Sequence, residues 1–185
     1  MTELTLSSRD RILALVAGEP GLHLREVHRR VGLSLRAVRY HLDVLGEEKR
    51  VTAYRSGRFE RWFEAGTFSE RERALISALR VRGQRAILAC LLRRGPMGFV
   101  SLQTALVLSS ATLARHLGRL MDSGLVEIGG DRRYQLEDIP ATRMYLTDYR
   151  LRFPDLLADA AQEIFMDESL RERPLVSEPS GPSEG

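Results

Sequence analysis

The 185-residue sequence predicts a mainly α-helical fold with small β-wings, in which two copies of one three-helix unit follow each other along the chain. A shift of 75 residues aligns 12–51 with 87–126 without a gap. Nine of these 40 pairs are identical, against roughly three for random pairing at average residue usage. Apolar residues recur at helical spacing in both copies. Each copy then ends in two short β-prone runs around a glycine-containing turn.

The first copy begins with a helix that Ser7 or Ser8 can cap and that extends to about Ala17. Pro20-Gly21 ends this helix. A second, shorter helix is predicted from about Leu24 to Arg30, with its apolar residues on one face.

A tight turn is predicted at Gly32-Leu33-Ser34, because Gly32 can adopt positive φ, Leu33 can enter the core and Ser34 can cap the next helix. The spacing of the third helix predicts that it buries a stripe made of Leu35, Val38, Leu42 and Leu45. Two helices joined in this way form a helix-turn-helix.

Two hairpins follow the third helices of the two copies. The run "RVTAYRSGRFERWFEAG" has β-prone segments around Arg55-Ser56-Gly57-Arg58, which predicts a hairpin with a basic tip. The second copy has the shorter "LVEIGGDRRYQLE", which turns at Gly129-Gly130-Asp131. A helix-turn-helix closed by a hairpin is a winged helix, so the sequence predicts two tandem winged helix-turn-helix domains joined by a helix, plus C-terminal helices.

The stretch "LREVHRRVGLSLRAVRYHLDVLGEEKRV" resembles the winged helix-turn-helix transcriptional regulators of prokaryotes, in particular archaeal-style tandem regulators and more broadly the ArsR/MarR-like superfamily. The resemblance covers about 8–65 well and 84–138 more weakly. It implies DNA binding through the third helix. One departure is Lys49-Arg50-Val51, where the family pattern has Gly-Leu-Val; the second copy keeps Gly124-Leu125-Val126.

The regions between and after the two copies complete the organisation. Ser69 and Glu72 form a capping-box pattern that predicts a linking helix, and Gly83 is expected to break or kink it. Pro140 suits the first turn of a further helix. The predicted segments are 1–66 (first winged helix, the main DNA reader), 67–83 (linking helix), 84–138 (second winged helix), 139–173 (C-terminal helices, candidate dimerisation elements) and 174–185 (disordered tail).

The outer face of the third helix carries the residue types that read DNA. Arginine can donate to guanine O6 and N7 or to a phosphate, and tyrosine can contact a phosphate or a thymine methyl group. A helix N-terminus capped by a serine favours a phosphate, and basic residues at a hairpin tip can enter the minor groove. The predicted DNA-binding residues of the first copy are Arg25, Arg29, Ser34, Arg36, Arg39, Tyr40, Arg55 and Arg58.

The second copy lacks most of this chemistry. Ala111 and Ala114 stand where the first copy has Arg36 and Arg39. The remaining candidates for DNA binding are Ser109, Thr112, Arg115, Arg119 and Arg132. The strip of Ala111, Ala114 and Gly118 is small and nearly uncharged, so it also suits close packing against another helix. Secondary DNA contact and a protein-interaction role both stay open for this copy.

The charge is distributed unevenly along the chain. Residues 22–61 hold ten Arg or Lys against five acids, whereas 154–185 hold eight acids and two arginines. A basic segment of this kind predicts one polyanion-binding region.

The sequence predicts neither an enzyme nor a metal or cofactor site. It contains no Walker loop, no GxSxG and no HExxH, so no catalytic residue is proposed. The single cysteine, Cys90, is expected to be buried, and His23 and His28 are five residues apart rather than four. No signal-peptide pattern or membrane-spanning apolar run is found, which predicts a cytoplasmic, nucleoid-associated protein with no membrane partner.

The predicted function is a transcriptional regulator that inserts its first recognition helix into the major groove of double-stranded DNA as a homodimer. One alternative is a tandem winged-helix interaction module, resembling the chromosome-segregation partners that bind a kleisin, with a protein partner on the second winged helix. Another is a chromatin-type DNA binder of low sequence specificity.

Overall fold

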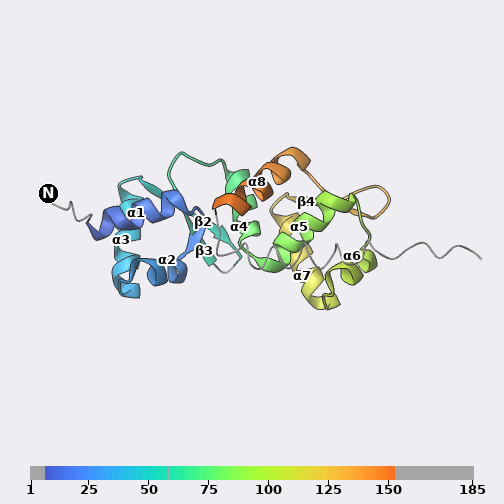
Figure 1. Ribbon diagram of the computed structural model, residues 1–185, viewed down its shortest axis with the longest axis horizontal. Helices are drawn as coiled ribbons and strands as arrows, with labels where there is room; N and C mark the ends of the chain where they lie inside the picture. Colours follow the sequence, from blue (N-terminus) through green and yellow to red (C-terminus); the bar gives the residue numbers. More distant parts are fainter. Residues whose placement is uncertain (1–6, 58, 153–185) are drawn as a thin grey trace, which may run out of the picture. The chain divides into compact units, whose positions relative to one another are not determined.

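The computed structural model describes residues 7–57 and 59–152, and of the side chains of residues 56 and 148–152 nothing is described (Figure 1). The predicted mainly helical fold with small antiparallel sheets is confirmed. In the first unit, three helices are combined with a three-stranded antiparallel sheet of order β1-β3-β2. These elements are α1 (Ser8–Gly18), β1 (Leu22–His23), α2 (Leu24–Val31), α3 (Leu35–Glu47), β2 (Val51–Ser56) and β3 (Phe59–Glu64).

Local signals set the helix ends of the first unit. Ser7 caps α1 by accepting a hydrogen bond from the Asp10 backbone N–H at 3.2 Å, and Ser34 caps α3 in the same way. Gly32 ends α2 with φ of +70°, as the predicted turn requires. Two features were not predicted: the short strand β1 and the capping box at the start of α2, in which His23 and Glu26 exchange hydrogen bonds.

The core of the first unit lies between the three helices and one face of the sheet. It includes Ile12, Val38, Leu42, Leu45 and Trp62, all of which are almost fully buried. The prediction that Leu35 joins this stripe is wrong, since 42% of its surface is exposed. Leu35 is the first residue of α3, and at that point the helix extends beyond the edge of the core.

The opposite face of the sheet packs against the linking helix α4 (Glu70–Leu79) and the segment before it. The rings of Phe63 and Phe68 meet edge to face, with centroids 5.9 Å apart. The capping box predicted for Ser69 and Glu72 is present. The prediction that Gly83 breaks this helix is wrong, because α4 ends at Leu79 and the extended residue Val81 separates it from α5 (Arg82–Arg94).

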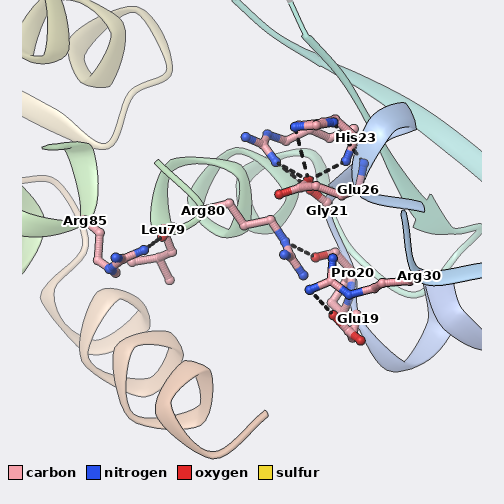
Figure 2. Close-up of polar contacts among 10 residues, drawn as sticks. Glu19, Pro20, Gly21, His23, Glu26, Arg30, Leu79, Arg80 and Arg85 are labelled. Carbon is pink, nitrogen blue, oxygen red and sulfur yellow. Dashed lines mark hydrogen bonds and ion pairs between the residues drawn. The ribbon is translucent and has the colours of Figure 1, made fainter. Parts of the chain in front are cut away.

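Three arginines donate hydrogen bonds to backbone carbonyls, and two of them, Arg80 and Arg85, are labelled in Figure 2. Arg80 donates to the Pro20 carbonyl and Arg85 to the Leu79 carbonyl, each at 2.8 Å. Arg61 donates to the Gly21 carbonyl at 2.7 Å and is 4% exposed. Arg61 therefore does not add to the basic surface, although it belongs to the basic segment of the sequence.

The second unit has the same order of helices and hairpin. It consists of α5, α6 (Phe99–Leu106), α7 (Ser110–Asp122) and the antiparallel pair β4 (Val126–Ile128) and β5 (Tyr134–Leu136). Cys90 is buried, as predicted. Seven matched pairs are buried in both units: Ile12/Ile87, Val16/Leu91, Val27/Leu102, Val38/Leu113, Leu42/Leu117, Leu45/Leu120 and Val51/Val126.

Helix α8 (Ile139–Arg152) follows the second hairpin, and Pro140 lies in its first turn, as predicted. α8 contacts both α4 and α5. The remainder of the predicted C-terminal helices and the predicted disordered tail, 174–185, lie outside the described residues.

Candidate nucleic-acid interface

The exposed face of α3 is the centre of the candidate site. Arg36, Arg39 and Tyr40 are all exposed, and Tyr40 has 64% of its surface in solvent. Leu35 lies on the exposed N-terminal turn of the same helix, so it adds an apolar group that suits a thymine methyl. The helical spacing predicted Leu35 in the core, so Leu35 was not among the predicted DNA-binding residues.

Arg39 is paired with two acidic side chains on this face. Its Nη1 donates to Glu60 Oε2 of β3 at 2.8 Å and lies 4.0 Å from Asp43 Oδ1. The hydrogen bond to Glu60 raises the pKa of Arg39 above its ordinary value. Both side chains are nearly half exposed, so the pair contributes about 1 kcal/mol or less to stability. Arg36, by contrast, forms no ion pair with the residues that the structure describes.

Helix α2 presents Arg25 and Arg29 to solvent. The two are four residues apart and share one side of the helix. The neighbouring Arg30 forms an ion pair with Glu19 at 3.1 Å (Figure 2). Arg25 and Arg29 are thus placed as exposed cations next to the recognition helix, as a backbone contact would require.

The first hairpin places its basic residues differently from the prediction. Arg55 lies within strand β2 rather than at the tip, and it is paired directly across the ladder with Glu60. Arg58 lies outside the described residues. Phe59, which is 39% exposed, stacks on the His23 ring with centroids 5.3 Å apart. Glu60 is thus an acidic residue within the basic face, and its position beside Arg39 was not predicted from the sequence.

The second unit presents a different surface at the equivalent helix. Ala111 and Ala114 are exposed where α3 carries its arginines, and Arg115 and Arg119 are exposed beside them. Ser109 caps α7 by accepting from the Thr112 backbone N–H, and the two hydroxyl groups are also hydrogen-bonded at 2.9 Å. The side chains of Ser109 and Thr112 are thus hydrogen-bonded to each other and to the backbone at the start of α7.

The turn before α7 and the second hairpin complete this surface. Val107 is 91% exposed and has φ of +51°, which is strained for a β-branched residue. Arg132 is exposed and also has positive φ, while Arg133 forms an ion pair with Asp131 at 3.2 Å. The second unit therefore carries fewer cations on a more apolar face.

His116 is buried between α5 and α7, where it lies against Gly83. A Cβ atom at Gly83 would come within 2.5 Å of the His116 Nε2 atom. Burial lowers the pKa of His116, and Arg115 and Arg119 lower it further. Within 7–57 and 59–152, no group of three or more His, Cys, Asp or Glu side chains is arranged to hold a metal ion.

A cavity of about 240 Å³ lies between α4 and α8, with Leu75 and Leu125 among its apolar lining residues. The Tyr145 hydroxyl donates to Glu72 at 2.6 Å at this cavity, and this hydrogen bond lowers the pKa of Glu72. In the described part of the chain, no helix has the length and apolar character needed to cross a bilayer.

Comparison with known proteins agrees with the local architecture. Residues 6–76 match a family model described as an N-terminal HTH domain, so this part of the chain has a helix-turn-helix fold of the DNA-binding type. No curated protein sequence matches the chain.

Two solved structures show weaker similarity. The mRNA-binding domain of elongation factor SelB from E. coli, in complex with SECIS RNA, is 15% identical, with 71% of this chain and 98% of that chain covered and a TM-score of 0.32. Human N-acetylserotonin methyltransferase in complex with SAM is also 15% identical, with 64% and 38% covered and a TM-score of 0.27. TM-scores of this size do not establish a common fold.

Proposed function

We propose that this chain is a DNA-binding transcriptional regulator and not an enzyme. It acts in the cytoplasm in association with the nucleoid, inserting α3 of the first unit into the major groove. The observation that carries the proposal is the exposed set of Arg36, Arg39 and Tyr40 on a serine-capped recognition helix, within a segment that matches an HTH domain. Guanidinium and phenol groups on such a helix suit base edges and phosphates.

Binding as a homodimer would double the length of DNA that is read, because two recognition helices contact two half-sites about one helical turn apart. Helix α8 is the candidate dimerisation element, since it exposes Ile139 and Met144, each about half accessible at 51%. Sedimentation of the full chain at several concentrations measures this association directly.

A second candidate function is a protein-interaction module centred on the second unit. It is favoured by one specific observation: Val100 and Val107 are 72% and 91% exposed, and Ala111 and Ala114 place methyl groups where α3 carries Arg36 and Arg39. The first unit could then bind DNA while the second unit binds a protein, so the two candidates do not exclude each other.

The proposed function is tested by binding of the full chain to a library of double-stranded genomic fragments at two salt concentrations. The test variant is Arg36→Ala/Arg39→Ala. Each arginine contact with DNA that is lost weakens binding by about 1–3 kcal/mol, so the double substitution should weaken binding by roughly 10²-fold or more. Both positions are exposed and alanine favours helix, so the variant should remain folded.

The matched control is Arg115→Ala/Arg119→Ala, which removes the same charge from α7 of the second unit. A regulator reading DNA through α3 should lose its preferred fragments in the α3 variant and keep them in the control. If the parent protein binds no DNA, the proposal is wrong. If it binds all fragments alike with a steep salt dependence, the low-specificity alternative is correct.

A further inference from the structure

The contact between α3 and the wing places a carboxylate in the middle of the proposed DNA-reading face. Glu60 lies on the same sheet face as Trp62, and that face packs towards the helices of the first unit. From there its Oε2 atom accepts a hydrogen bond from Arg39 Nη1 at 2.8 Å. Glu60 also stands directly across the ladder from Arg55, and residues in such pairs share one face of the sheet.

A carboxylate at this position changes what Arg39 can bind. The pairing offsets the guanidinium charge, and an approaching phosphate would be repelled by Glu60. Guanine O6 and N7 are neutral acceptors, so they require N–H donors rather than net charge. A guanidinium has five N–H donors, and Arg39 remains 48% exposed while it is paired. The paired Arg39 is therefore better suited to a base edge than to the backbone.

We propose that Glu60 is a specificity-determining positioning residue, which holds Arg39 for guanine readout and disfavours its use as a phosphate contact. This inference rests on the proposed function. In this proposal the two arginines of α3 have different roles. Arg36, which has no ion pair among the described residues, supplies sequence-independent attraction, and Arg39 supplies discrimination.

The test variant is Glu60→Gln, which keeps the shape and a carbonyl acceptor and removes the charge. The full chain is titrated against two double-stranded oligonucleotides at several salt concentrations. One carries the site selected by the parent protein from random DNA, and the other is the same sequence scrambled. Glu60→Gln should bind the scrambled duplex about three- to tenfold more tightly, so that the preference for the selected site falls by about the same factor.

The salt dependence gives a second, independent readout. Each additional phosphate contact steepens the slope of log K against log salt concentration by about 0.9. Glu60→Gln should show this change on the scrambled duplex, because Arg39 becomes a phosphate contact. The change should disappear when Glu60→Gln is combined with Arg39→Ala.

Glu47→Gln is the matched control, since Glu47 is exposed on α3 and forms no ion pair within the described part of the chain. If Glu47→Gln reproduces the effects of Glu60→Gln, net charge alone explains them and the inference is wrong. The inference is also wrong if Glu60→Gln keeps the parent's preference and salt slope while the parent binds its site. A parent protein that binds no DNA would instead show that the proposed function is wrong, and the inference would fall with it.

Discussion

The two units bury equivalent side chains but expose different ones. Leu42 and Leu117 are both almost fully buried at the same position of their third helices. Three residues before each of them, Arg39 and Ala114 are both exposed, yet one is a cation and the other a methyl group. The buried positions are therefore apolar in both units, while at matched exposed positions the third helix is cationic in the first unit and carries small apolar side chains in the second.

The backbone shows a second difference. Each unit adopts positive φ at two matched positions: at the turn before the third helix, which holds Gly32 or Val107, and at the start of the hairpin, which holds Lys49 or Gly124. Each unit has glycine at one position and a side chain at the other. A left-handed residue that is not glycine costs about 1–2 kcal/mol. The first unit therefore has backbone strain at the start of its hairpin, and the second unit has it at the turn before its third helix.

The largest expected effect tests the shared core. Leu42→Ala and Leu117→Ala should each lower the free energy of unfolding by about 2–5 kcal/mol, because each leaves a cavity beneath the third helix. The single tryptophan, Trp62, is buried in the first unit and reports its unfolding by fluorescence, whereas circular dichroism follows the helices of both units.

These two readouts separate the units. Leu42→Ala should shift the urea midpoint of Trp62 fluorescence, and Leu117→Ala should shift the helical signal first. If either substitution lowers the free energy of unfolding by less than 1 kcal/mol, the two cores are not equivalent.

A smaller effect is expected at the close approach that only the second unit has. Gly83→Ala should lower the free energy of unfolding by about 1–3 kcal/mol, because the added methyl group overlaps the buried His116 ring. The control is Gly118→Ala in α7, where nothing lies within 4 Å of the new methyl group. Replacing a helical glycine by alanine there should stabilise the protein by about 0.5–1 kcal/mol. Equal urea midpoints for the two variants would disprove the contact.

Much of the fold could be predicted from the sequence, because the signals are local. Ser34 and the pair Ser69 and Glu72 mark helix starts within three residues, and Gly32 marks a turn that needs positive φ. Periodicity failed at Leu35, since it shows which face of a helix is apolar but not where the core ends. Gly83 was misjudged because its reason is a neighbour 33 residues away, His116.

The candidate site was less predictable for the same physical reason. The exposure of Arg36 and Tyr40 follows from the helical period and agrees with the structure. The pairing of Arg39 with Glu60 joins residues 21 apart, and it depends on how the hairpin packs against α3. Arg61 was counted only as one of the bases of segment 22–61. Its burial against the Gly21 carbonyl depends on the strand β1, which is too short to give a sequence pattern.

A third prediction concerns the turn before the third helix, where the first unit has Gly32 and the second unit has Val107. Val107→Gly should raise the free energy of unfolding by up to about 1 kcal/mol, because it relieves a left-handed β-branched residue and loses no buried contact. Gly32→Ala should lower it by about 1 kcal/mol, although nothing lies within 4 Å of the new methyl group, because alanine disfavours the same backbone conformation. Urea denaturation measures both changes. Opposite signs at these matched positions are expected, and equal signs would contradict the proposed difference in strain.

The smallest effect is a dependence on pH that the second unit gains from His116. Burial lowers the pKa of this imidazole in the folded state, so below about the unfolded value of 6.5 the unfolded chain binds more protons than the folded chain. Stability should therefore fall as the pH drops from 6.5 towards the lowered folded pKa, and then level off. His23 acts in the same direction, because burial also lowers its pKa. His116→Gln should flatten the slope of unfolding free energy against pH in the helical signal and leave the Trp62 fluorescence slope unchanged. An unaltered slope in both signals would show that His116 is not buried in its neutral form.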